Sequence, residues 1–282
     1  MTPDQYCQEK AVASGSSFYY SFLFLPPPRR RAITALYAFC REVDDVVDES
    51  TDAGIAAQTL AWWRAELVRL DAGSPTHPVT QALLPHMSEY GITTLRLNQI
   101  IDGMQMDLEP RRYLDFAGLE RYCFHVAGVV GLLSAGIFGI TQEATLDYAK
   151  ELGIAFQLTN IIRDVGEDAR IGRIYLPVDE LERFQVPAAD LAAARYSAGF
   201  TELMRFQASR ARATYERAYA LLPPIDRNAQ RPGLIMAGIY GTLLDEIERE
   251  DFRVLHQRIA LTPLRKLWIA WRTWIGTRHR RS

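Results

Sequence analysis

Oxygen-bearing side chains recur at helical spacing in two distant segments of the sequence. In REVDDVVDE, Asp44 and Asp48 lie four residues apart, so on a helix they share one face, one turn apart. In LGIAFQLTNIIRDVGEDARIGRIYLP the polar members step by three, four and four residues: Gln157, Asn160, Asp164 and Asp168. Leucine, isoleucine and phenylalanine surround this second stripe, and buried oxygen atoms need a partner that compensates for their lost hydration.

The chemistry that fits these atoms is the binding of a divalent cation. If the two faces meet, each pair of carboxylates about 4 Å apart repels by about 1 kcal/mol in water and about 4 kcal/mol at intermediate dielectric. Arg41 and Arg163 can neutralise part of that charge. Carboxylate and amide oxygens also suit Mg²⁺, which prefers a site shared with substrate phosphates. The first segment alone is compatible with a solvated surface, but the second favours a Mg²⁺ site for a phosphorylated ligand.

Helices must position both segments, because helical periodicity recurs along most of the chain. Apolar residues return every three or four positions, as at Leu60, Trp63, Leu67 and Leu70. Proline and glycine interrupt the pattern at intervals that leave helices of about 12 to 25 residues. Convincing strand alternation is absent. We therefore predict an all-α domain of about eight to ten helices.

Length and composition bound the class of protein. The chain has 282 residues, is 48% hydrophobic and carries a formal charge of -2, which favours one large folded domain over a disordered chain. The near-neutral charge provides no field for nucleic acid, so we expect no nucleic-acid partner. The three cysteines are widely spaced, which is typical of a reducing compartment, and no signal peptide is visible. We expect a cytoplasmic protein.

The longest apolar stretch, residues 126–140, has 15 residues and falls short of the roughly 20 that cross a bilayer. It contains four glycines, each of which costs a helix about 1 kcal/mol relative to alanine. Two explanations stay open. The glycines leave room for a hydrocarbon tail beside the backbone, or they allow close packing of helices.

The last 20 residues differ from the rest, because they contain six Lys or Arg and no acid. We therefore divide the chain into a main domain, 1–262, and a basic, tryptophan-rich tail, 263–282. On a helix, five apolar residues of the tail share one face: Leu264, Leu267, Trp268, Trp271 and Ile275. Such a face with basic residues beside it is typical of a helix that lies on a membrane surface. The alternative is a helix packed on the body with a basic end.

Five blocks in a fixed order carry a family resemblance. They are SSFYYSF, YAFCREVDDVVDE, YCFHVAGVVG, QLTNIIRDVGEDARIGRIYLP and AGIYGTLLDEIE. Together they resemble the squalene and phytoene synthases, which are prenyltransferases of the isoprenoid-synthase helical fold with a central cavity. Within that family, SGSSFYYSFLFLP followed by ALYAFCREVDDVVDE is most similar to the bacterial presqualene diphosphate synthases of hopanoid pathways.

The resemblance implies roles for individual residues of this sequence. Two helices that face the cavity would hold Mg²⁺ through Asp44, Asp48, Asn160, Asp164 and Asp168. The substrates would be bound by Ser17, Phe18, Arg41, Gln157, Arg163 and Tyr240. The four aspartates and Tyr122 would be catalytic, with Tyr122 or released pyrophosphate as the base for the last proton. His125 stands where animal squalene synthases have a tyrosine, and we expect a core or hydrogen-bonded histidine there.

The implied reaction joins two farnesyl diphosphates head to head into presqualene diphosphate, which feeds squalene and hopanoid synthesis. The alternatives are a phytoene synthase acting on geranylgeranyl diphosphate, a full squalene synthase using NADPH, and a non-catalytic helical assembly module. We expect Mg²⁺ as cofactor and no use of NADPH. The expected partners are farnesyl diphosphate, downstream pathway enzymes and, through the tail, the inner membrane surface.

Overall fold

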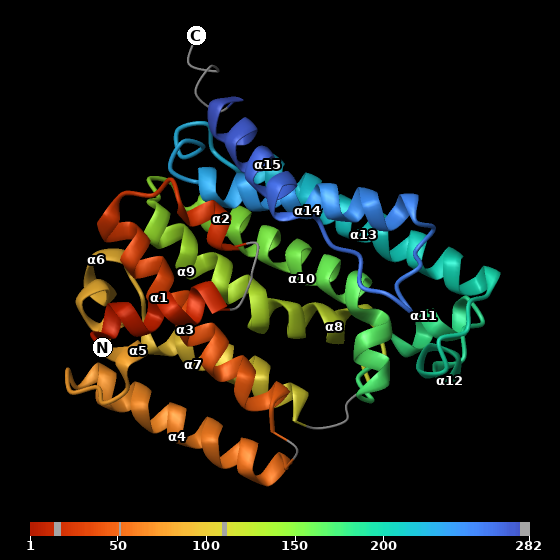
Figure 1. Cartoon of the computed structure of the whole chain (residues 1–282), viewed down its shortest axis with the longest axis horizontal. Coiled ribbons are helices and arrows are strands. Elements are labelled where there is room, and N and C mark those ends of the chain that lie inside the picture. Colours follow the sequence, from red (N-terminus) through yellow and green to blue (C-terminus); the bar gives the residue numbers. More distant parts are fainter. Residues whose placement is uncertain (14–17, 51, 109–111, 277–282) are drawn as a thin grey trace.

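Helices build the described part of the chain, which in this computed structural model is residues 1–13, 18–50, 52–108 and 112–276 (Figure 1). No β-strand occurs in these ranges, which confirms the all-α prediction. The helices are α1 Pro3–Ala13, α2 Phe18–Phe22, α3 Pro27–Asp48, α4 Ala53–Asp71, α5 Pro78–Leu83, η1 Leu84–His86, α6 Met87–Tyr90, α7 Thr94–Asp107, α8 Phe116–Cys123, η2 Phe124–Gly128, α9 Val129–Phe138, α10 Ala144–Arg170, α11 Val178–Arg183, α12 Ala188–Ala192, α13 Ala198–Leu221, α14 Arg231–Arg249 and α15 Pro263–Gly276.

The number of helices exceeds the prediction because several are too short for periodicity to reveal. Helices α2, α5, α6, α11 and α12 have between four and six residues each. Two of the long helices, α3 and α4, begin at ordinary start signals. Asp52 accepts hydrogen bonds from the backbone of Gly54 and Ile55 at the start of α4. Pro27 opens α3, where the missing N–H of proline has no intrahelical partner to lose.

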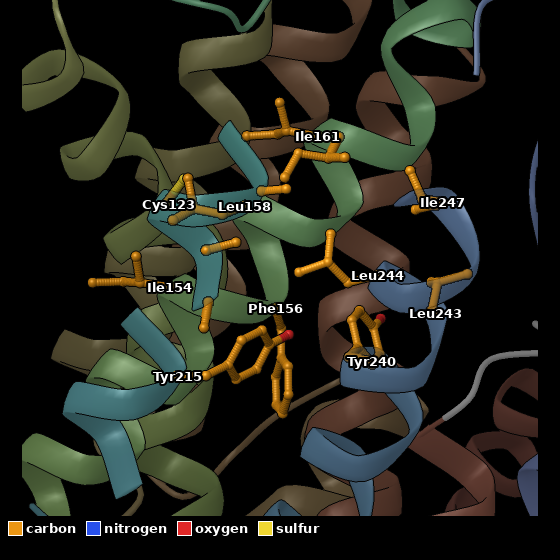
Figure 2. Close-up of a cluster of buried hydrophobic side chains, with 14 of the residues drawn as sticks. Cys123, Ile154, Phe156, Leu158, Ile161, Tyr215, Tyr240, Leu243, Leu244 and Ile247 are labelled. Atoms are coloured by element: carbon orange, nitrogen blue, oxygen red, sulfur yellow. The ribbon is translucent and has the colours of Figure 1, made fainter. Parts of the chain in front are cut away.

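Helix α10 forms the centre of the fold (Figure 1). It packs against α9, α13 and α14, and it buries Ile154 and Leu158. Figure 2 shows Phe156 of α10 close to Tyr215 of α13 and Tyr240 of α14, with ring centroids 6.1 and 4.9 Å away. Because α10 is covered on several sides, the residues of its polar stripe are half-buried.

A second hydrophobic cluster surrounds α3. It joins buried residues of α1, α4, α5, α7 and α9, including Phe39 of α3, which meets Trp63 of α4 edge to face. This packing fixes the direction of α3. Its acidic C-terminal end therefore approaches the C-terminal end of α10.

Close contact of η2 and α9 with α10 explains two glycines. A Cβ atom on Gly131 would lie 2.2 Å from the carbonyl oxygen of Ala149, and one on Gly153 would lie 2.3 Å from that of Ala127. Real side chains do not tolerate such distances, so any larger residue would push the helices apart. The explanation by close helix packing therefore holds at Gly131.

Helices α8, η2 and α9 continue into one another as a single run, Phe116–Phe138. With 23 residues and a mean hydropathy of 1.4 in its most apolar window, this run is long and apolar enough to cross a membrane by length and composition. The apolar segment expected from the sequence, residues 126–140, is shorter than this run, because the helix begins ten residues earlier. In this fold the run packs against α10, α7 and α3 as a core helix.

Candidate active site

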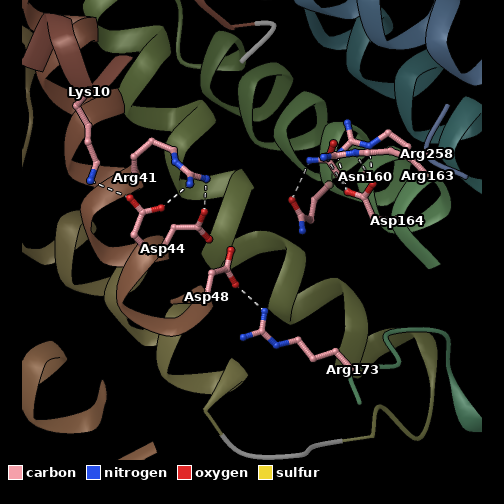
Figure 3. A network of polar contacts seen from close by, with 11 residues as sticks. Lys10, Arg41, Asp44, Asp48, Asn160, Arg163, Asp164, Arg173 and Arg258 are labelled. Carbon is pink, nitrogen blue, oxygen red and sulfur yellow. Dashed lines mark hydrogen bonds and ion pairs between the residues drawn. The ribbon is translucent and has the colours of Figure 1, made fainter. Parts of the chain in front are cut away.

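The acidic end of α3 lies against the loop that follows α10 in the folded chain. Asp48 is the last residue of α3, and Asp168 lies in the last turn of α10. Arg173, in the loop after α10, donates to Asp48 Oδ1 at 2.7 Å and to the carbonyl oxygen of Val47 at 3.0 Å (Figure 3). The fold therefore brings together two segments more than a hundred residues apart, while their binding of metal stays a prediction.

Arginine and lysine side chains pair with the acids of α3. Arg41 donates to Asp44 at 2.5 Å and also to Asp45, which follow it by three and four residues on α3. Lys10 of α1 lies 2.8 Å from Asp45 and 3.2 Å from Glu42. Asp45 is thus held from two sides by cations of the protein, whereas Asp44 has Arg41 as its ion-pair partner among the described residues.

A second arginine cluster covers α10. Arg163 donates to both oxygens of Asp164, at 2.7 and 2.5 Å. Arg258, from the segment after α14, lies 3.1 Å from Asp164 and 3.6 Å from Glu167 (Figure 3). These guanidinium groups are fixed forks of donors, which also suit diphosphate oxygens.

Burial and mutual repulsion raise the pKa values of two of the acids. Burial is the larger cause for Asp44 and the charge of Asp48 the next, and the pKa rises to about 7. Burial, followed by the charge of Asp164, raises the pKa of Asp168 to about 7. A cation among these groups would favour the ionised forms and reverse both shifts. The electrostatics therefore suit a bound cation.

An amide oxygen adds a second indication. Asn160 Oδ1 is buried and has no hydrogen-bond partner in the described part of the chain, whereas its Nδ2 donates to Gln157 Oε1 at 3.3 Å. A buried acceptor without a donor costs stability unless a ligand satisfies it. Amide and carboxylate oxygens together form the donor set of a hard divalent cation.

The carboxylates do not form a closed cage. Among the residues that the structure describes, no three His, Cys, Asp or Glu side chains converge closely enough to hold a metal ion by themselves. Arginines lie against several of the acids instead. This arrangement fits Mg²⁺, which commonly takes one or two carboxylates and completes its shell with water and substrate phosphates. The donors fit a metal shared with a diphosphate.

A buried acid that the sequence did not single out lies in the same space. Asp107, the last residue of α7, accepts hydrogen bonds from Tyr122 at 2.8 Å and from Tyr175 at 2.9 Å. Burial raises the pKa of Asp107 to about 6, although the two tyrosines and Arg173 lower it. Burial also raises the pKa of Tyr122 well above its ordinary value, so its phenol stays protonated. Tyr122 therefore serves as a donor to Asp107, and it can accept a proton only by passing its own to that acid.

One signal in the sequence pointed to Asp107. Leu97, Ile100 and Met104 define the buried face of α7, and the same three- and four-residue steps end on Asp107. An acid on an apolar stripe is a candidate for a functional group. Arg173 and Tyr175 lie in a loop, where no periodicity marks them.

An apolar cavity begins beside these polar groups. It lies between α2, α3, α9, α10 and α14 and has a volume of about 160 Å³. Gln157 and Asn160 line one end, next to the acids. Phe18, Phe22 and Tyr37 form part of its wall, with Phe18 and Tyr37 ring centroids 5.8 Å apart. The arrangement combines a polar end with a long hydrocarbon compartment.

The remaining predicted residues are distributed as follows. Burial raises the pKa of Tyr240, and the neighbouring Arg163 and Asn160 lower it by less. Ser17 lies outside the described residues. His125 is hydrogen-bonded, with Nδ1 3.1 Å from the carbonyl oxygen of Gln99, which agrees with the expected hydrogen-bonded histidine.

Comparison with known proteins decides the family. A family model described as Squalene/phytoene synthase matches residues 11–265. The chain belongs to this family. It is therefore an enzyme of the prenyltransferase type, and the expected family and isoprenoid-synthase fold are confirmed. A dehydrosqualene synthase in complex with ligand superposes with a TM-score of 0.84 and 27% identity, covering 98% of this chain and 96% of that one. Squalene synthase HpnC from Alicyclobacillus acidocaldarius has a TM-score of 0.77 and 27% identity, over 89% of this chain and 94% of that one.

The curated relatives correct the expected substrate. Phytoene synthase of Arthrospira platensis is 36% identical over 274 residues, covering 93% of this chain and 89% of the relative. The 15-cis-phytoene synthase of Synechocystis sp. is 35% identical over 280 residues, covering 94% and 83%. The prediction of farnesyl diphosphate as substrate and presqualene diphosphate as product is therefore wrong. It rested on short motifs around the diphosphate site, which do not encode the length of the hydrocarbon compartment.

Proposed function

We propose that this enzyme joins two molecules of geranylgeranyl diphosphate head to head into phytoene. The observation that carries the proposal is the similarity to phytoene synthases, at 36% and 35% identity over 93% and 94% of the chain. The acidic faces beside an apolar cavity support it, because the reaction requires a diphosphate site next to a hydrocarbon site.

The polar end of the site serves the departure of the first diphosphate. A divalent cation, when bound, neutralises the anion as it leaves the allylic carbon. The residues that would hold it are Asp44, Asp48, Asn160, Asp164 and Asp168. Arg41, Arg163 and Arg173 can turn from these carboxylates to the diphosphate, since a guanidinium binds both kinds of oxygen. The same movement frees carboxylate oxygens for the cation.

The apolar walls protect the carbocation that remains. Aromatic rings of Phe18, Phe22 and Tyr37 offer negative π faces, and the two phenylalanines carry no nucleophile. Exclusion of water from this compartment prevents hydrolysis of the reactive carbon.

Asp107 and the two tyrosines that donate to it, Tyr122 and Tyr175, are our candidates for removing the last proton from the substrate. Asp107 has a pKa raised to about 6, so it can accept a proton near neutral pH. Tyr122 and Tyr175 hold its two oxygens in place, and their rings stack with centroids 5.1 Å apart. In this arrangement Tyr122 relays a proton to Asp107.

Product analysis tests the proposal. Purified protein is incubated with Mg²⁺ and either farnesyl or geranylgeranyl diphosphate, with and without NADPH, and the products are identified by mass spectrometry. We expect phytoene from geranylgeranyl diphosphate without any need for NADPH. Turnover of farnesyl diphosphate alone would refute the assignment.

We propose further that α15 docks on an anionic membrane surface. Its outward face exposes four large apolar side chains in one stripe: Leu264, Leu267, Trp268 and Trp271. Arg272 lies over the Trp268 ring at 5.3 Å, and no acid occurs in the helix. Tryptophan with arginine or lysine is the pairing typical of the lipid headgroup region.

The opposite face of α15 ties it to the substrate compartment. Ile269 and Ala270 are buried, and Trp274 stacks on Phe24 with centroids 4.9 Å apart. Helix α15 also contacts α2, which contributes Phe18 and Phe22 to the cavity wall. A membrane-bound α15 would place the cavity within one helix of the lipid that dissolves substrate and product.

Vesicle sedimentation tests the docking surface. Trp268→Ala with Trp271→Ala should abolish binding to phosphatidylcholine vesicles that contain phosphatidylglycerol, while turnover in detergent is kept. Trp62→Ala is the matched control, since Trp62 of α4 is also exposed and lies against an arginine, Arg69, away from α15. Equal binding by the double variant and the control would refute the docking surface.

A further inference from the structure

The far end of the apolar cavity is lined by residues of two helices and of the turn before α14. Tyr148 of α10 lies 12 residues before Asn160, which is about 18 Å along the helix at 1.5 Å per residue. It is the cavity-lining residue of α10 farthest from the acids. Phe138 at the end of α9 and Gln230 before α14 line the same end. We call Phe138, Tyr148 and Gln230 the floor of the cavity.

Hydrogen bonds hold the floor in place. Gln230 Nε2 donates to the carbonyl oxygens of Ala135 at 3.2 Å and Gly139 at 2.9 Å, so it ties the start of α14 to the end of α9. Asp226, four residues earlier, accepts from the backbone and side chain of Thr141, just before α10. The backbone around the floor is therefore fixed, and changes of its depth must come from side chains.

Tyr148 differs from its neighbours in the floor. Its side chain is 1% exposed, and its hydroxyl has no hydrogen-bond partner in the described part of the chain. Burial raises the pKa of this phenol far above its ordinary value, so the hydroxyl is neutral. A phenylalanine would avoid the cost of an unsatisfied buried hydroxyl. Core packing alone therefore does not explain a tyrosine here.

A glycine makes room for this phenol. A Cβ atom on Gly233 of α14 would lie 2.9 Å from Tyr148 Oη and 3.4 Å from Leu152 Cδ2. The first distance is too short for unbonded atoms, so alanine at this position would displace the Tyr148 ring. Gly233 itself lines the cavity. The position of the ring thus depends on the absence of one methyl group.

We propose that Tyr148, seated against Gly233, is the stop that sets the longest prenyl tail the cavity accepts. The proposal rests on the proposed function, which places a prenyl tail in this cavity, and it adds the residue pair that measures the tail. The tail enters with its diphosphate at the acidic end and its terminal isoprene unit against the Tyr148 ring. A tail with one more unit meets the ring, and a shorter one leaves space above it.

Two variants change the depth of the floor in opposite directions, and a third should restore it. Tyr148→Leu shortens the floor residue and should admit a tail one isoprene unit longer. Gly233→Ala should push the ring toward the tail and favour farnesyl over geranylgeranyl groups. Tyr148→Phe together with Gly233→Ala removes the hydroxyl that meets the new methyl group, so it should restore the original preference.

Binding of unreactive substrate analogues provides the measurement. The probes are the thiodiphosphate analogues of farnesyl, geranylgeranyl and geranylfarnesyl diphosphate, titrated calorimetrically in Mg²⁺. Relative to the unaltered protein, Gly233→Ala should shift the affinity ratio of the first two probes by at least about tenfold toward farnesyl. Tyr148→Leu should shift the ratio of the last two by about tenfold toward geranylfarnesyl. The double variant should return to within about threefold of the unaltered protein.

The outcomes separate this proposal from the proposed function. Unchanged ratios in folded Tyr148→Leu and Gly233→Ala proteins, checked by circular dichroism, would overturn the stop. A shift in Gly233→Ala that the added Tyr148→Phe does not reverse would also overturn it, because the contact between the two residues would then be irrelevant. If the unaltered protein turns over only farnesyl diphosphate, the function fails, yet the predicted shifts of the ratios still test the stop.

Discussion

Replacement of Asp226 by asparagine tests how the fold fixes the end of the cavity. Asp226 lies in the turn between α13 and α14 and is 1% exposed. Its Oδ2 accepts from Thr141 N at 2.9 Å, Gln142 N at 3.1 Å and Thr145 Oγ1 at 2.6 Å. Its Oδ1 accepts from Thr141 Oγ1 at 2.5 Å. These contacts join the turn to the start of α10.

The expected loss is about 2 kcal/mol of unfolding free energy at pH 7. Burial raises the pKa of Asp226, but the hydrogen bonds together outweigh it and lower the pKa from 3.8 to about 2. Each unit of pKa corresponds to about 1.4 kcal/mol. Asparagine keeps one acceptor, and its amide nitrogen can face Thr141 Oγ1, whose hydroxyl can turn to accept. The variant therefore loses the charge but should still fold.

The loss should depend on pH in a definite direction. The folded-state pKa is lowered, so the stabilisation is fully present above the unfolded pKa near 4 and disappears as the pH falls through about 2. The difference between the two proteins should therefore shrink between pH 5 and about pH 2. Backbone packing alone would produce a difference that does not change with pH.

Urea unfolding, followed by circular dichroism, measures the difference. Asp147→Asn is the matched control, because Asp147 in the first turn of α10 is 60% exposed and lies 3.5 Å from Lys150. The control should change stability by less than about 0.5 kcal/mol. An Asp226→Asn protein as stable as the control would show that the turn does not hold the end of the cavity as argued.

Further predictions concern the polar end of the site. Asp44→Asn and Asp164→Asn should each slow turnover at least about 100-fold, a barrier rise of about 2.7 kcal/mol, with an unchanged circular dichroism spectrum. Glu167→Gln, on α10 like Asp164, is the control and should keep most activity. Normal turnover in either aspartate variant would contradict the metal assignment. Tyr122→Phe should cost roughly 1.5–3 kcal/mol in urea unfolding because Asp107 loses one of its two tyrosine donors; no loss would show that this bond does not stabilise the fold. Calorimetry should find Mg²⁺ binding at least about tenfold tighter with pyrophosphate than without, since arginines occupy the carboxylates until an anion draws them away. Equal affinity in both conditions would refute that competition.

Local rules allowed the sequence to predict the helices and their acidic faces. The pairs Asp44 with Asp48 and Asp164 with Asp168 share a face because residues four apart always do so on a helix. The family resemblance then supplied the general chemistry. Short helices such as α6 escaped prediction, since four residues show no period.

Contacts between distant segments were beyond those rules. Arg173 and Tyr175 belong to a loop, and only the fold places them against Asp48 and Asp107. The substrate was predicted wrongly for the same reason, because the motifs describe the diphosphate end of the cavity and not its depth.

What the sequence determined by itself is the helical class, the family and the two acidic faces, all of which depend on residue type and on spacing within one helix. Tertiary structure alone decided that Arg173 meets Asp48, that Arg258 meets Asp164, and that Tyr148 and Gly233 lie together in the cavity wall. The physical reason is that Tyr148 and Gly233 lie 85 residues apart in the sequence. Their contact therefore depends on how α10 and α14 pack together, which spacing within one helix does not determine.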